Sequence, residues 1–97
     1  MTRSPLAEPA LIVATAEHVH CAVGDEAVVL HVGRGTYYGL NAVGARIWAL
    51  VQAPRTVGEI LDRLTDEFEV DRDTCARDLA QWLEVLEGYG LVEVRGA

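Results

Sequence analysis

The sequence has few basic residues and no long apolar run, and both absences narrow the classes of function. Eight Lys and Arg stand against 15 Asp and Glu, so the formal net charge is −7 at pH 7. An acidic chain repels phosphate backbones, and we therefore expect no nucleic-acid partner. No apolar stretch approaches the roughly 20 residues that span a bilayer, so no membrane partner is expected. Residues 10–16 are only marginally long for a signal-peptide core and lack a convincing cleavage site, which predicts a cytoplasmic protein.

Reactive groups are also scarce. Cys21 and Cys75 are the only cysteines and lack CxxC spacing, so we expect reduced, buried thiols. No nucleophile motif or Gly-rich phosphate loop is present, which predicts a protein that is not an enzyme and holds no cofactor. His18, His20, Cys21 and His31 could suggest a metal site. A closed zinc site needs four converging ligands, however, and polar residues on a wet sheet face explain this set better, so no metal is expected.

The length of 97 residues allows one domain. We expect residues 1–16 to form a partly flexible N-terminal arm and residues 17–97 to form the domain. Segments rich in β-branched residues come first and three helical segments follow, which predicts an α+β fold with a three-stranded antiparallel sheet. The helices carry start signals: Asn41, the capping box from Thr56 to Glu59, and Asp71.

The strands 18–23, 26–32 and 36–40 form a predicted meander. A two-residue turn pairs Cys21 with Val28 and Val19 with Leu30. A three-residue loop that ends at Gly35 then places Leu30 opposite Tyr38 and Val28 opposite Leu40. This register gathers one set on a single face, which we expect to be the core face: Val19, Cys21, Val23, Val28, Leu30, Val32, Tyr38 and Leu40. The other face, expected to meet water, carries His18, His20, Val29, His31 and Tyr37.

Residues 36–40 form an edge strand with neither charge nor proline, although edges are normally protected in such ways. The third helix carries apolar residues over more than one contact face, among them Cys75, Leu79, Trp82 and Leu86. A deeply buried helix is one explanation. The alternative is a groove between helix and edge, in which an extended peptide adds a strand.

The block Tyr38-Gly39-Leu40-Asn41-Ala42-Val43-Gly44-Ala45-Arg46-Ile47-Trp48, followed by Thr-Val-x-Glu-Ile, resembles the PqqD-like family. This family is also called the RiPP precursor peptide recognition element, where RiPP denotes a ribosomally made and modified peptide. The resemblance extends from about Val19 to Val94 and is strongest to the stand-alone leader-binding proteins of lasso peptide biosynthesis.

The resemblance implies a winged helix-turn-helix fold and a leader peptide antiparallel to the third strand, against the third helix. The implied peptide-binding residues are Leu30, Thr36, Tyr37, Tyr38, Gly39, Cys75, Asp78, Leu79, Trp82 and Leu86. Which of the two tyrosine rings faces the groove stays open. The implied partners are the precursor leader, a separate cysteine-protease-like leader peptidase that removes it, and, as a further candidate, the cyclase.

Two alternatives remain open. Winged helices often bind DNA, so the chain could be a DNA-binding regulator, although its third helix has more acidic than basic residues. The exposed edge could instead join two copies of the chain in a purely structural subunit.

Overall fold

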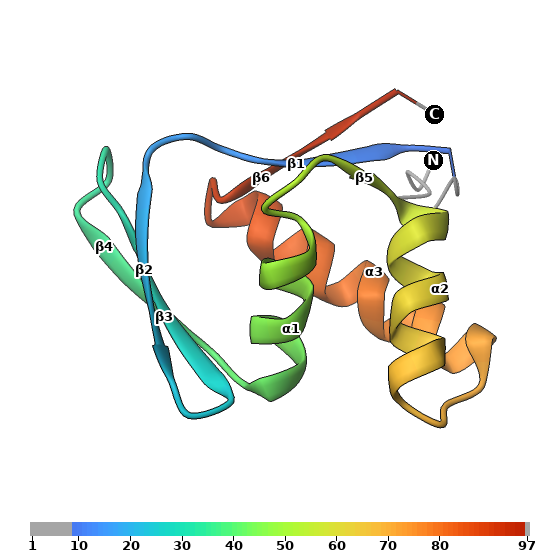
Figure 1. Cartoon of the computed structure of the whole chain (residues 1–97). Coiled ribbons are helices and arrows are strands. Elements are labelled where there is room, and N and C mark those ends of the chain that lie inside the picture. The colour runs from blue at the N-terminus through green and yellow to red at the C-terminus, as the bar shows by residue number, and fades with distance from the viewer. Residues whose placement is uncertain (1–8, 97) are drawn as a thin grey trace.

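The structure is a computed structural model that describes residues 9–96. In this part, six strands and three helices follow one another (Figure 1): β1 (Leu11–Ala14), β2 (His18–Val23), β3 (Glu26–His31), β4 (Thr36–Leu40), α1 (Ala42–Leu50), β5 (Arg55–Thr56), α2 (Val57–Glu67), α3 (Arg72–Gly88) and β6 (Val92–Arg95). The α+β class is confirmed, with a three-stranded antiparallel sheet and three helices after it. No helix among the described residues is long and apolar enough to cross a membrane.

Of the two strand pairings in the β2–β3–β4 sheet, one has the predicted register and the other does not. β2 and β3 pair as expected, with Cys21 opposite Val28, around a turn in which Gly24 has φ 65°. Between β3 and β4 the prediction was wrong by one residue, because Leu30 lies opposite Tyr37. The loop has four residues rather than three, since His31 pairs with Thr36, and the Gly35 N–H donates to the His31 carbonyl at 2.8 Å.

The predicted core face of this sheet was wrong for β2 and β3 but right for Tyr38 and Leu40 of β4, which pack on the core. In β3 the buried residues are Ala27 and Val29, whereas Val19 of β2 is 60% exposed. The imidazole rings of His18 and His20 lie on the inner side, with their centroids 4.7 and 6.0 Å from that of Trp48. The face that carries the histidines is therefore the inner one, because Trp48 of α1 packs against it. The pattern of apolar residues along the strands does not contain this information.

A second sheet, in the order β5-β1-β6, was not predicted as a sheet. The final extended segment was expected, and it becomes β6, which pairs antiparallel with β1. Residues 11–14 were assigned to a partly flexible arm, but they form the central strand, with Ile12 fully buried. Residues 1–8 of that predicted arm lie outside the described residues.

Side chains at the predicted positions begin all three helices. The Asn41 carboxamide accepts from the Gly44 N–H at 3.0 Å, Thr56 and Glu59 form the capping box, and the Asp71 carboxylate accepts from the Thr74 N–H at 3.0 Å. Just after α3 and its cap residue Tyr89, Gly90 has a left-handed backbone conformation with φ 76°. The Leu91 N–H then donates to the Leu86 carbonyl at 3.0 Å, the hydrogen bond of a Schellman motif.

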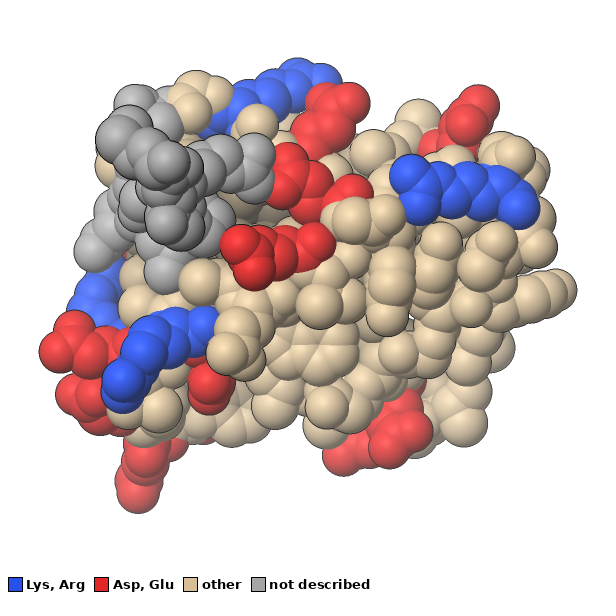
Figure 2. Space-filling model, turned by 180° about the vertical axis from the view of Figure 1, so that it is seen from behind, with Lys and Arg blue, Asp and Glu red and all other residues tan. Residues whose placement is uncertain are grey.

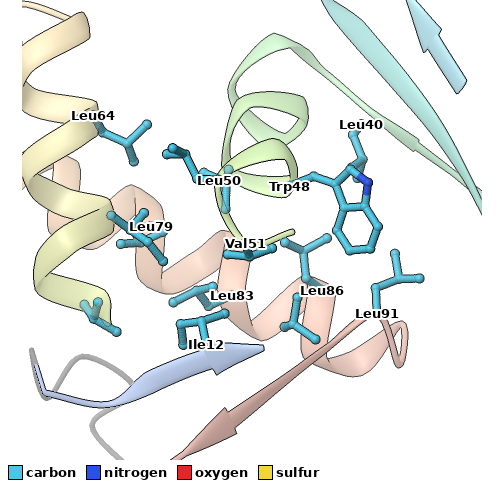
Figure 3. Close-up of a cluster of buried hydrophobic side chains, with 14 of the residues drawn as sticks. Ile12, Leu40, Trp48, Leu50, Val51, Leu64, Leu79, Leu83, Leu86 and Leu91 are labelled. Atoms are coloured by element: carbon cyan, nitrogen blue, oxygen red, sulfur yellow. The ribbon is translucent and has the colours of Figure 1, made fainter. Parts of the chain in front are cut away.

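α3 contributes to the centre of the core, where both sheets and the other two helices also send apolar side chains. Figure 3 shows Leu79, Leu83 and Leu86 pointing into this cluster. Ile12 of β1 and Leu91 close it from the side of the second sheet. Only part of the apolar surface of α3 is therefore left to line a groove.

Candidate functional site: a groove between β4 and α3

The free edge of β4 borders a groove along α3. In the described part of the chain, β4 pairs with β3 alone, so its other edge has no strand neighbour. The groove beside it has a volume of about 390 Å³. Its lining is Gly39 of β4 together with Gln81, Trp82, Val85 and Tyr89 of α3 and its C-terminal cap. An unpaired edge beside apolar and aromatic side chains can accept an extended peptide as an added strand.

Trp82 is held against α1 by the absence of a side chain at Gly44. A Cβ atom at Gly44 would lie 2.5 Å from Cη2 and 2.6 Å from Cζ3 of the Trp82 ring. Real Cβ atoms essentially never come so close to another carbon, so only glycine at this position allows the observed ring placement. The indole is partly buried, with one side packed on the core and another lining the groove.

The two adjacent tyrosines of β4 have different positions. The Tyr38 ring stacks on Tyr89, with centroids 3.8 Å apart and an interplanar angle of 17°. This stack bridges β4 and the C-terminal end of α3. The Tyr37 side chain is 70% exposed and lies on the opposite face of the sheet, because neighbouring strand residues point to opposite sides. Tyr38 is thus the ring on the groove side.

An apolar pocket of about 210 Å³ lies further along α3, toward the start of this helix. Its lining comes from all three helices and from the α2–α3 connection: Val43, Ile47, Leu64, Phe68, Val70, Cys75, Asp78 and Leu79. Because residues three or four apart share one helix face, Cys75, Asp78, Trp82 and Val85 form one continuous row. The pocket and the groove therefore lie along the same side of α3.

Asp78 is the one charged residue in the pocket lining. Burial raises the pKa of the Cys75 thiol, and the nearby Asp78 carboxylate raises it further. The thiol is 6% exposed and so forms a neutral, apolar part of the wall at pH 7. A side chain with an apolar body and a basic tip would fit this combination, since the carboxylate favours a cation at the rim.

The structure brings together only some of the residues predicted for peptide binding. Gly39 and Trp82 line the groove, and Cys75, Asp78 and Leu79 line the pocket. Thr36 is exposed on β4, while Leu86 is fully buried in the core, beyond the reach of a peptide in the groove. Leu30 pairs with Tyr37 on the outer face of the sheet, and β4 separates it from the free edge.

Eight residues that line the groove or the pocket were missing from the sequence-based set: Val43, Ile47, Leu64, Phe68, Val70, Gln81, Val85 and Tyr89. A signal for two of them was present, because Val85 and Tyr89 follow Trp82 at spacings of three and seven residues. Val43 and Phe68 are among the exposed large apolar side chains.

A larger hollow, of about 540 Å³, lies between the β2–β3 hairpin and α1, but its features fit a peptide less well. Its charged lining residues are Asp25, Glu26 and Arg46. The basic one is already engaged, since the Arg46 Nε donates to Glu67 Oε1 at 2.7 Å. Much of the rest is alanine, which offers little contact area. The hollow also lies on the helix side of the hairpin, whereas the β4 edge adjoins the α3 groove.

The charges around the groove are unfavourable for nucleic acid. Figure 2, which views the molecule from the side of α3, shows a broad uncharged area across the middle with both acidic and basic side chains at its margins. Within the described residues, the groove lining itself contains no basic residue. Among residues 9–96, no group of three or more His, Cys, Asp or Glu could hold a metal ion. His18 is engaged through Nδ1, 2.7 Å from the Thr15 carbonyl.

Comparisons with known proteins identify the family and support the fold. The family described as "Coenzyme PQQ synthesis protein D (PqqD)" matches residues 26–92, and no curated protein matches the chain. A solved structure described as "TbiB1 in Complex with the TbiA(beta) Leader Peptide" is similar, with a TM-score of 0.80 and 39% sequence identity over 88% of this chain and 99% of that chain. The resemblance seen in the sequence is confirmed, and the chain belongs to the PqqD family.

Proposed function

We propose that this protein binds the leader region of a ribosomally made precursor peptide, of the lasso class, and delivers it to a separate leader peptidase. The observation that carries the proposal is the unpaired edge of β4 beside the groove that Trp82 lines. The similarity to TbiB1, whose structure contains a leader peptide, supports the nature of the ligand.

The leader would add to β4 as an antiparallel strand. β4 runs from Thr36 toward α1, where Val43 lines the apolar pocket. An antiparallel partner therefore has its N-terminal part near the pocket and its C-terminal part near the Tyr38–Tyr89 stack. The five residues of β4 cover about 17 Å at roughly 3.4 Å per residue. Backbone hydrogen bonds would give affinity, and every second leader side chain would enter the groove.

Recognition of sequence would come from the pocket and from Trp82. One apolar leader side chain would fill the pocket between Val43, Phe68 and Leu79. A Lys or Arg close to it would meet the Asp78 carboxylate. Interfaces of this kind concentrate their binding energy in a few buried anchors, with Trp prominent among them. We therefore expect Trp82 to be the largest single contributor.

The protein would recognise the leader without cutting it. Among the described residues that line the groove and the pocket, Cys75 of the pocket supplies the one thiol, and a raised pKa keeps it protonated and poorly nucleophilic. Proteolysis would then require a second protein, the cysteine-protease-like peptidase, and ring closure a cyclase. The complex would form in the cytoplasm, where the precursor is made.

DNA binding, the alternative function for such a fold, has less support. The row on α3 that lines the groove and pocket contains Asp78 and apolar residues but no basic one. A recognition helix needs Arg or Lys toward phosphates and base edges.

An N-methyl scan of a synthetic leader tests strand addition. Methylation of a backbone nitrogen removes a hydrogen-bond donor and leaves the side chain unchanged. We expect the affinity, measured by fluorescence anisotropy, to fall at every second position, because a strand's N–H groups point alternately toward and away from its neighbour. An alanine scan of the same leader serves as the side-chain control. An N-methyl profile without this alternation would refute strand addition, and no binding of any leader would refute the proposed function.

A further inference from the structure

The face of the β2–β3–β4 sheet that points away from the helices is apolar and open. The strand register places these residues on it: Val19, Cys21, Val23, Glu26, Val28, Leu30, Tyr37 and Gly39. Val19, Val23 and Tyr37 are 60%, 58% and 70% exposed. The only charged residue among them is Glu26, at the hairpin end. We call this surface the outer face.

The outer face reverses the usual arrangement of a sheet that meets water. Such sheets normally turn polar side chains outward and apolar ones toward the core. Here His18 and His20 are turned inward against Trp48, and valines are turned outward. Contiguous exposed apolar surface of this kind marks interaction sites in soluble proteins.

The position of the outer face links it to the leader. β4 contributes both Tyr37 to this face and the free edge to the groove. A leader that adds beside β4 would extend the sheet by one strand, and every second leader side chain would emerge on the outer face next to Tyr37. A protein bound to the outer face would therefore contact both this chain and the bound leader.

The charges favour a different protein over a second copy of this chain. Each copy has a formal net charge of −7, so two copies repel one another. Glu26 lies at the hairpin end of the outer face and Asp25 in the turn beside it, and these carboxylates would attract basic side chains. We propose that the outer face docks the leader peptidase, through an apolar patch of the peptidase bordered by basic residues. This inference rests on the proposed function.

The experiment compares two exposed positions that receive the same charge. Val19→Arg places a cation in the middle of β2 on the outer face, whereas Ala53→Arg places one on the exposed connection between α1 and β5. Each variant is assayed for leader affinity by anisotropy and for cleavage of the same leader by a cysteine-protease-like leader peptidase. For each variant we compare the concentration of the leader-binding protein at which cleavage of the leader reaches half of its maximal rate.

We expect Val19→Arg to raise this concentration at least about tenfold, because docking would bury an unpaired charge. Its leader affinity should stay within about twofold of the wild type, and Ala53→Arg should match the wild type in both assays. The inference would be overturned, while the proposed function stands, by either of two results. One is that Val19→Arg stimulates leader cleavage as well as the wild type does; the other is that Ala53→Arg loses as much stimulation as Val19→Arg. A wild-type dimer by sedimentation that Val19→Arg dissociates would assign the outer face to a second copy. A wild-type chain that binds no leader would instead refute the proposed function.

Discussion

The contact between Gly44 and Trp82 allows a test of the groove by one added carbon. A Cβ at Gly44 would lie 2.5 Å from the Trp82 ring, whereas carbon atoms pack at about 3.5–4.0 Å. In Gly44→Ala the ring must therefore move by roughly 1 Å. Trp82 is only partly buried and can move toward the groove. The displaced ring would occupy space meant for the leader.

The expected effect is a loss of binding with little change in stability. Crowding of a packed site lowers the free energy of unfolding by about 1–3 kcal/mol. Replacement of Gly by Ala in a helix raises it by up to about 1 kcal/mol. We expect the free energy of unfolding, from urea titration, to fall by no more than about 2 kcal/mol. Leader affinity, from anisotropy, should fall about tenfold, which corresponds to about 1.4 kcal/mol.

Gly88→Ala is the matched control, because a Cβ at this helical glycine meets no atom within 4 Å. It should keep both affinity and stability. In a Trp82→Ala background, Gly44→Ala should have no further effect on affinity, since the ring that it displaces is absent. The reasoning fails if Gly44→Ala binds the leader like the wild type. It also fails if stability falls by more than about 3 kcal/mol while the folded fraction binds normally, because Trp82 would then be only a core residue.

Four further predictions concern residues of the row along α3. Trp82→Ala should weaken leader binding by about 2 kcal/mol, as expected for a buried aromatic anchor, and anisotropy with a melting curve separates lost binding from lost folding. Asp78→Asn should flatten the salt dependence of binding to a leader with a basic residue; an unchanged slope would exclude this ion pair. The expectation of two buried thiols was wrong for Cys21, which is exposed, and right for Cys75, which is buried. Iodoacetamide should therefore modify Cys21 first, and bound leader should protect Cys75 further. The raised pKa of Cys75 adds stability that is fully present below the thiol's ordinary pKa and is lost as the pH rises through the folded-state pKa; urea titrations of Cys75→Ala should lack this decline.

Local signals in the sequence predicted the local structure. The helix starts at Asn41, Thr56 and Asp71 depend on hydrogen bonds within three residues, so the sequence contains all of the information. The turn at Gly24 likewise determined the β2–β3 register. The edge character of β4 followed from the absence of a later strand next to it, and family resemblance supplied its ligand.

The orientation of the sheet depended on tertiary contacts and was predicted wrongly. Val19, Cys21 and Val28 look like core residues in a strand pattern. They lie outside because Trp48, distant in sequence, covers the histidine side. The same limit applies to α3, where periodicity gave one broad apolar stripe. Only the packing of β1 and α1 decides that Leu86 belongs to the core and Val85 to the groove.

The N-terminal strand provides a last test of how the fold supports the groove. Ile12 is fully buried in β1, between β5 and β6, and belongs to the cluster that contains Leu83 of α3. Ile12→Ala should lower the free energy of unfolding by about 2–5 kcal/mol, through lost apolar burial and the cavity left behind. Its matched control, Val19→Ala, removes an exposed valine from an outer strand and should cost less than about 1 kcal/mol. Equal effects of the two changes in urea titration would mean that residues 11–14 are an arm rather than part of the core. Because α3 rests on this cluster, Ile12→Ala should weaken leader binding only in proportion to the unfolded fraction.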